Sequence, residues 1–175
     1  MATFDDIYEI AADNYGLVTA AEAAGAGAAT SEVARWVRQG RLVRVWRGVY
    51  RLAHYIPTPY DGYAEAVAIV GPGAYLFGES VIALHGLAPT NPKVTHVATP
   101  RRVRRELPDS IAVTPAPPGG AVTAYEGIPS QGVFDSILAC RGRLMRERLA
   151  QAADAALGRG LITREQRDAL EKGIS

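Results

Sequence analysis

Residues 28–52, AATSEVARWVRQGRLVRVWRGVYRL, decide the fold of the N-terminal part of this chain. Thr30 or Ser31 is expected to cap a helix, because a side-chain oxygen there accepts hydrogen bonds from the free N–H groups of the first turn. Gly40 is expected to end the helix, since glycine commonly follows the last helical turn. The apolar residues in between recur at the i, i+3, i+4 spacing of one buried face: Val33, Trp36 and Val37.

A short basic hairpin is predicted directly after this helix. Leu42–Trp46 indicates a strand, Arg47-Gly48 a tight turn, and Val49–Leu52 the returning strand. Arginine at this density suits phosphates and base edges, because the guanidinium group donates several hydrogen bonds in one plane. The alternative is that the arginines only solvate a small surface hairpin. Six arginines with no acidic residue among them lie between Val33 and Tyr60: Arg35, Arg38, Arg41, Arg44, Arg47 and Arg51.

A shorter helix is predicted upstream. Ala20–Ala24 has Thr19 as its N-cap, and Gly25-Ala26-Gly27 forms the turn to the next helix. Helix, glycine-containing turn and helix together are the sequence form of a helix-turn-helix. With the hairpin, the pattern predicts a winged helix-turn-helix. Its second helix would enter the major groove, and its hairpin would lie along the DNA backbone or reach the minor groove.

The composition fits one medium-sized domain or two small ones. The chain has 175 residues, 48% hydrophobic content and a formal net charge of +1, so overall charge gives no reason to expect nucleic-acid binding. A local basic face on a nearly neutral protein is still compatible with specific DNA binding. A first helix over Phe4–Asn14 collects acidic residues that are expected to face away from DNA: Asp5, Asp6, Glu9 and Asp13.

A domain junction is predicted at residues 54–59, HYIPTP, because two prolines within three residues disfavour regular structure. We therefore expect a winged helix-turn-helix domain over residues 1–55. A small mixed α/β domain that ends in helices is expected over residues 60–175, so the fold class is α+β. Strands are predicted over residues 94–98, 111–114 and 122–125. Helices are predicted over residues 60–70, 75–87, 130–140 (capped by Ser130), 146–157 and after a Thr163–Gln166 capping box.

The sequence contains no strong catalytic or metal-binding pattern. The single cysteine, Cys140, excludes an intramolecular disulfide and is expected to be a small core residue. The three histidines lack metal-ligand spacing. Ser80, His85 and Asp135 could be drawn as a triad, but His85 is more often a packing residue than a base in such an apolar helix. We expect a non-enzymatic protein with no cofactor and no metal.

The N-terminus and the hydropathy pattern give an expectation about location. Met1 to Asp13 is acidic, whereas a secretory signal has a basic start and an apolar run. No apolar run reaches the roughly 18 residues that a membrane span needs. A cytoplasmic protein without a membrane partner is therefore expected.

The densest charge run follows the strand predicted at residues 94–98. A nucleic-acid role would be a second phosphate contact that adds affinity without sequence choice. The run could instead face an acidic partner, or be a solvated loop. Its arginines are Arg101, Arg102, Arg104 and Arg105.

An ordered set of short motifs suggests a family. In the N-terminal part these motifs are Gly16-Leu17-Val18-Thr19, Arg38-x-Gly40-x-Leu42 and Arg47-Gly48-Val49-Tyr50. Further along they are Leu84-His85-Gly86-Leu87, the strand Thr95–Thr99 before a basic segment, Glu126-Gly127-Ile128-Pro129 and Gly160-Leu161-Ile162-Thr163. Taken together, the chain resembles AbiEi-type antitoxins, the antitoxin halves of abortive-infection toxin–antitoxin pairs.

The resemblance implies a two-domain repressor and antitoxin. The N-terminal domain would bind inverted repeats in double-stranded DNA at its own promoter, and the C-terminal domain would be needed to neutralise a nucleotidyltransferase-like toxin. Some relatives carry a C-terminal nuclease domain, which is not expected in this chain. Arg35 and Gln39 are the best candidates for base edges, and Arg47 for the minor groove. Carried onto this sequence, the DNA contacts are Thr30, Ser31, Arg35, Arg38, Gln39, Arg44, Arg47 and Arg51.

Two other functions stay open at the level of sequence. One is a winged-helix regulator without a toxin, whose C-terminal domain senses a ligand or forms a dimer. The other is an enzyme of the C-terminal domain, which would need convergent ionisable groups. The oligomeric state is open too. Two copies on an inverted repeat would place their recognition helices about 34 Å apart if the half-sites are one helical turn apart. The protein could also be a monomer in solution, with two copies meeting only when both are bound to DNA.

Overall fold

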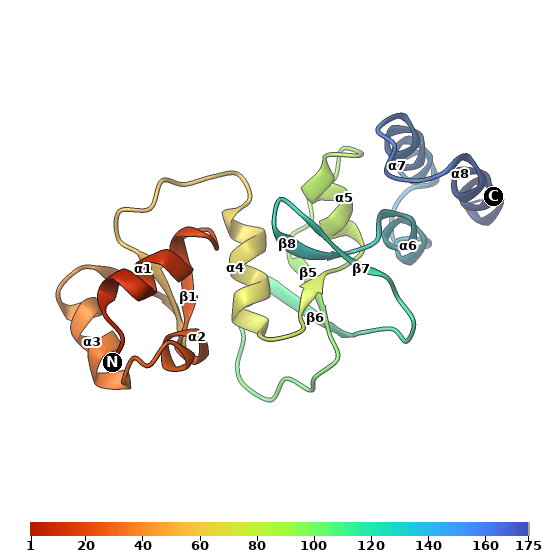
Figure 1. Ribbon diagram of the computed structural model, residues 1–175. Helices are drawn as coiled ribbons and strands as arrows, with labels where there is room; N and C mark the ends of the chain where they lie inside the picture. Colours follow the sequence, from red (N-terminus) through yellow and green to blue (C-terminus); the bar gives the residue numbers. More distant parts are fainter. Residues whose placement is uncertain (175) are drawn as a thin grey trace. The chain divides into compact units, whose positions relative to one another are not determined.

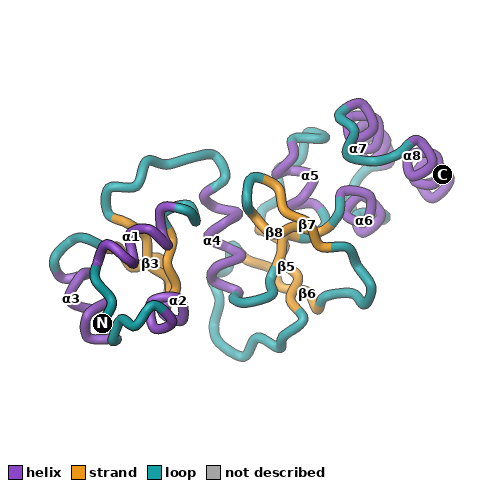
Figure 2. Tube along the Cα trace, in the orientation of Figure 1, coloured by secondary structure: helices purple, strands orange, loops and turns teal. Residues whose placement is uncertain are grey.

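The computed structural model describes residues 1–174 and has a mixed α+β fold, as the sequence predicted (Figure 1). The chain divides into two compact units, Met1–Gly71 and Pro72–Ser175. Figure 2 shows that helices and strands are mixed in both units. The N-terminal unit contains α1 (Phe4–Ala12), β1 (Leu17–Thr19), α2 (Ala20–Gly25), α3 (Thr30–Arg38), β2 (Leu42–Trp46), β3 (Val49–Leu52) and α4 (Asp61–Val70).

The sheet of the N-terminal unit has three antiparallel strands in the order β1-β3-β2. The hairpin of β2 and β3 lies where the sequence predicted it, and the turn glycine, Gly48, has a φ of +77°. The third strand, β1, was not predicted, because three residues are too short to show a strand pattern. Leu17 and Val18 of β1 are nevertheless fully buried, since the pairing of β1 with β3 places them in the interior.

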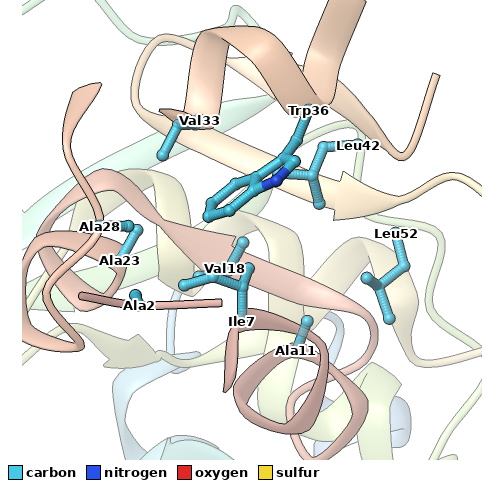
Figure 3. Packing of buried hydrophobic residues seen from close by; sticks show 10 residues of the cluster. All are labelled: Ala2, Ile7, Ala11, Val18, Ala23, Ala28, Val33, Trp36, Leu42 and Leu52. Atoms are coloured by element: carbon cyan, nitrogen blue, oxygen red, sulfur yellow. The ribbon is translucent and has the colours of Figure 1, made fainter. Parts of the chain in front are cut away.

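The core of the N-terminal unit lies between the helices and one face of this sheet. Figure 3 shows Trp36 of α3 next to Leu42 and above Ile7 and Val18. Trp36 is 3% exposed, and its ring meets the ring of Phe4 edge-on at a centroid distance of 5.6 Å. Aromatic and branched side chains from four elements therefore fix the position of α3.

The ends of the helices follow from local hydrogen bonds. Thr3 caps α1 in a capping box with Asp6, whose pKa is lowered chiefly by the backbone N–H of Thr3. Thr19 caps α2 as predicted, and the structure adds a capping box with Glu22 that was not predicted. The predicted cap of α3 by Thr30 or Ser31 is wrong. The N-cap is Ala29, one residue earlier, because the Glu32 carboxylate accepts the Ala29 N–H at 2.8 Å.

Gly40 ends α3 as predicted. Its φ is +70°, the left-handed conformation that follows many helices. The Gly40 N–H donates to the Val37 carbonyl at 3.0 Å, and the Arg41 N–H donates to the Trp36 carbonyl at 2.9 Å. This pair of bonds is a Schellman motif, and it turns the chain directly into β2.

Helix α4 belongs to the N-terminal unit, although residues 54–59 were predicted to separate it from that unit. Arg51 of β3 forms an ion pair with Glu65 of α4 at 2.9 Å, and the Tyr55 hydroxyl donates to Asp61 at 2.8 Å. These two contacts connect α4 to β3 and to Tyr55, so the proline segment does not separate α4 from the N-terminal unit. The division between compact units falls at Gly71, where α4 ends.

The second unit is built on a five-stranded sheet in the order β6-β5-β4-β8-β7. Its strands are β4 (Tyr75–Leu76), β5 (Thr95–Thr99), β6 (Ile111–Pro115), β7 (Val122–Tyr125) and β8 (Ile128–Gln131). Its helices are α5 (Glu79–His85), α6 (Val133–Ala139), α7 (Arg146–Gly158) and α8 (Arg164–Ile174).

Two predictions in the second unit are wrong. Residues 75–87 are not one helix, because Tyr75 and Leu76 form the central strand β4 and Gly78, with a φ of +55°, separates it from α5. Ser130 does not cap α6, because it lies within β8. The N-cap is Gly132, and the buried Gln131 side chain accepts the Gly78 N–H at 3.1 Å.

The final helices agree with their predicted positions. Thr163 and Gln166 form the predicted capping box, with the Gln166 N–H donating to the Thr163 hydroxyl at 3.1 Å. Cys140, after α6, is 2% exposed and is a core residue. Burial raises the pKa of its thiol to about 11, so the thiol is un-ionised at neutral pH.

Candidate nucleic-acid interface

Helix α3 divides into a buried face and a polar face. Val33 and Trp36 point into the core. At 100° per residue, Ser31, Arg35 and Arg38 lie on the opposite side of the helix, whereas Thr30 in the first turn and Gln39 at the C-cap lie at the borders between the two faces. In the part of the chain that the structure describes, Arg35 and Arg38 form no ion pair. Five exposed polar side chains are carried by α3 and its C-cap, and the buried face of α3 fixes the helix to the core. These five are Thr30, Ser31, Arg35, Arg38 and Gln39.

Two arginines of the predicted wing, the hairpin that follows α3 in the sequence, are exposed. Arg44 lies on β2 opposite Tyr50 of β3. Because side chains two positions apart in a strand point to the same face, Arg44 shares a sheet face with Leu42, whose side chain is in the core. A register shift between Arg44 and Trp46 bends the strand at this point. Arg47 lies in the turn itself and is exposed.

Arg51 does not join this exposed set, although it was predicted to contact DNA. Its register partners are Leu17 and Val43, which lie on the other face of the sheet from Arg44. There it forms the ion pair with Glu65, and its guanidinium group lies 5.6 Å from the centroid of the Tyr55 ring. Its side chain is only 21% exposed. Arg51 thus holds α4 to the sheet, and its charge is already paired.

Arg41 has a contact that sequence reasoning missed. Its guanidinium carbon lies 3.5 Å from the centroid of the Phe4 ring, which is a cation–π contact between the start of the wing and α1. Phe4 also packs on Trp36. No local pattern indicated this pair, because Phe4 and Arg41 are far apart in the sequence.

The basic run of the second unit lies in the loop between β5 and β6. Arg101, Arg102 and Arg104 are exposed there, as is Arg105. The Arg101 N–H donates to the Thr99 hydroxyl at 3.2 Å, which fixes the start of the loop. The run is thus an exposed basic loop of the second unit.

The residues drawn as a catalytic triad do not form one. The Ser80 hydroxyl accepts the His96 backbone N–H at 2.8 Å, and no hydrogen bond to either ring nitrogen of His85 is found among residues 1–174. The His85 ring stacks on Tyr125 at a centroid distance of 3.9 Å. Burial, and then the charge of Arg159, lower the pKa of His85 to about 4. Among the described residues, no cluster of His, Cys, Asp or Glu could hold a metal ion.

The fold defines the N-terminal unit as a winged helix-turn-helix, an architecture that many DNA-binding proteins use. Residues 5–53 match the family described as "Transcriptional regulator, AbiEi antitoxin". This match confirms the predicted resemblance to AbiEi-type antitoxins for the N-terminal segment. The matched segment is less than half of the chain, and it runs from the second residue of α1 to the residue after β3.

Comparison with solved structures gives a weaker likeness. The crystal structure of the RV2827C protein from Mycobacterium tuberculosis is similar, with 17% sequence identity and a TM-score of 0.49. The similarity covers 97% of this chain and 71% of that chain. A likeness at this level carries no argument about function. No protein with a curated description matches the sequence. In the part of the chain that the structure describes, no helix is long and apolar enough to cross a membrane.

Proposed function

We propose that this protein is a transcriptional repressor that binds inverted repeats in the promoter of its own operon. The observation that carries the proposal is the match of residues 5–53 to an antitoxin regulator family. The exposed polar face of α3 supports it, because a helix of this kind can present Arg35 and Gln39 to base edges. Such a protein would act in the cytoplasm, where the operon DNA lies.

We assign different roles to the exposed side chains of the interface. Arg35 and Gln39 would read bases in the major groove, and Arg38 would contact a phosphate. Thr30 and Ser31, in the first turn of α3, would donate hydroxyl hydrogen bonds to phosphate oxygens. In the wing, Arg44 would follow the DNA backbone and Arg47 would reach the minor groove. Arg51 is left out of this set because of its ion pair with Glu65.

A mobility-shift assay tests the DNA-binding role. The full chain is titrated against the DNA upstream of its gene and against scrambled DNA, at two salt concentrations. We expect selective binding that survives the higher salt, and loss of that selectivity on Arg35→Ala. Arg146→Ala is the matched control, because Arg146 is an exposed arginine of the second unit and should not affect binding. Equal binding to both DNAs, or none, would contradict the proposal.

We further propose that the protein neutralises a nucleotidyltransferase-like toxin and has no enzymatic activity of its own. What supports this part is the antitoxin description of the matched family. Co-expression with the product of the adjacent gene tests it: cells that express the toxin should recover only when this chain is present. Rescue by residues 1–71 alone would contradict the assignment of neutralisation to the second unit.

The alternative is a winged-helix regulator without a toxin, whose second unit senses a ligand or forms a dimer. The same rescue experiment separates the two functions. A neighbouring gene whose product is not toxic, together with selective promoter binding, would favour this alternative.

A further inference from the structure

Strand β7 is an edge of the five-stranded sheet, and its outer side is unprotected. Val122 is 54% exposed, and Thr123 and Ala124 are exposed as well. The strand Val122–Tyr125 contains neither a charged residue nor a proline. The opposite edge, β6, ends in Pro115, whose missing N–H discourages pairing. Exposed edge strands usually carry charges or proline, because they otherwise pair with another chain.

The alternation of hydrogen-bonded and non-hydrogen-bonded pairs in the β7–β8 hairpin shows which backbone groups of β7 point away from β8. The Gly132 N–H donates to the Ala121 carbonyl at 2.9 Å, so the next pair, Val122 and Gln131, is a non-hydrogen-bonded pair. Pairs alternate along an antiparallel ladder, which makes Ala124 and Pro129 the next pair of the same type. The N–H and C=O groups of Val122 and Ala124 therefore point away from β8.

The spacing of these outward N–H and C=O groups allows β7 to pair with β7 of a second copy of the protein. We propose that β7 pairs antiparallel with β7 of a second copy, with Thr123 facing Thr123 across a two-fold axis. In this register Val122 lies opposite Ala124 of the second copy, and the reverse pair forms at the other end. Each pair exchanges two backbone hydrogen bonds, which gives four in total. In no other antiparallel register of residues 122–125 do the outward N–H and C=O groups of both Val122 and Ala124 find partners.

The side chains fit the same register. Thr123 and its counterpart form a non-hydrogen-bonded pair, in which side chains approach closely and threonine pairs are favourable. Val122 packs beside the small side chain of Ala124 on the other face. The absence of charge in β7 removes the repulsion that a two-fold axis imposes on any charged residue placed on it. A second copy is thus the occupant that the strand fits.

The pairing is isologous and closes after two copies, so it produces a dimer and no filament. A two-fold axis also suits an inverted repeat, whose half-sites are related in the same way. The inference itself does not rest on the proposed function, because the dimer is measured without DNA. A dimer that fails to bind DNA would contradict only the repressor role.

A charge-swap experiment tests the register. Sedimentation velocity on the full chain over a concentration series should show a monomer–dimer equilibrium. Thr123→Lys and Thr123→Glu each place two like charges at the axis, and each variant alone should dimerise at least tenfold more weakly. An equimolar mixture of the two should recover the dimer, because the charges are then opposite. Asn91→Lys, at an exposed position in the segment between α5 and β5, is the matched control and should dimerise like the unmodified chain.

A proline variant tests the backbone hydrogen bonds. Ala124→Pro removes an outward N–H from each copy and leaves the bonds to β8 intact. It should weaken the dimer by about 30-fold, whereas Ala124→Ser keeps the N–H and should not. Circular dichroism melting checks that each variant is folded. A monomer at the highest soluble concentration would overturn the inference, as would a folded Ala124→Pro variant with unchanged dimerisation or a charge-swap mixture that stays monomeric.

Discussion

The ion pair of Arg51 with Glu65 gives a prediction that separates the structural arginine from the proposed DNA-contacting ones. Arg51→Ala should destabilise the N-terminal unit without changing how DNA binding depends on salt. The N–O distance of the pair is 2.9 Å, and the two side chains are 21% and 32% exposed. An ion pair at this burial lies between a surface pair, worth at most about 1 kcal/mol, and a buried one, whose disruption costs about 3–5 kcal/mol.

We therefore expect Arg51→Ala to lower the free energy of unfolding by about 2 kcal/mol, including the lost contact with the Tyr55 ring. Urea unfolding of the full chain, followed by tryptophan fluorescence of α3 and β2, measures this change. A double-mutant cycle with Glu65→Gln isolates the coupling between the two side chains.

Arg47→Ala is the contrasting variant, because Arg47 is exposed in the wing turn. It should leave stability within about 0.5 kcal/mol of the unmodified chain. If Arg47 meets a phosphate, the slope of log K against log salt should fall by about 0.9. The reverse result would refute the reasoning: a stable Arg51→Ala variant with a reduced salt slope would place Arg51 at the DNA.

Three further predictions concern the interior and the helix ends. Trp36→Ala, at a site 3% exposed, should cost about 3–5 kcal/mol and abolish binding to every DNA, and a cooperative urea transition of unchanged midpoint would contradict it. Gly40→Ala places a side chain at a φ of +70° with no atom within 4 Å of the new Cβ, so only backbone strain of about 1–2 kcal/mol is expected; Gly40→Asn should cost less in the same thermal-melting measurement. The pKa of His85 is about 4 in the folded state and near 6.5 when unfolded, so the unfolded chain binds the proton more readily. Stability from this group is present above about pH 6.5 and is lost as the pH falls towards 4, by at most about 3 kcal/mol. Urea unfolding at pH 7 and pH 4.5 should show this loss, and His85→Phe should reduce it.

The parts of the fold that the sequence predicted are those that depend on neighbouring residues. The hairpin of β2 and β3 follows from two apolar, valine-containing stretches on either side of an Arg-Gly turn, and the end of α3 follows from Gly40. The N-cap at Thr19 and the capping box at Thr163 each involve only residues within three positions of the threonine. Such local signals are present in any short window of the sequence.

The parts that were missed depend on distant partners. Strand β4 has two residues, and its pairing with β5 and β8 is what makes it a strand. Ser130 resembled a helix cap only because β8 was not recognised. The same holds for the candidate interface: exposure of Arg35 and Arg38 follows from helical spacing, whereas the pairing of Arg51 requires α4, which begins ten residues after it.

The strand order of the second unit has a consequence for synthesis on the ribosome. Its central strand, β4 at Tyr75–Leu76, pairs with Ser130 of β8, so the sheet cannot close until more than fifty further residues have left the exit tunnel. All elements of the winged helix-turn-helix, and the helix α4 that is tied to it, are complete by Gly71. The nascent chain can therefore fold its winged helix-turn-helix unit first, while the rest of the protein is still being translated.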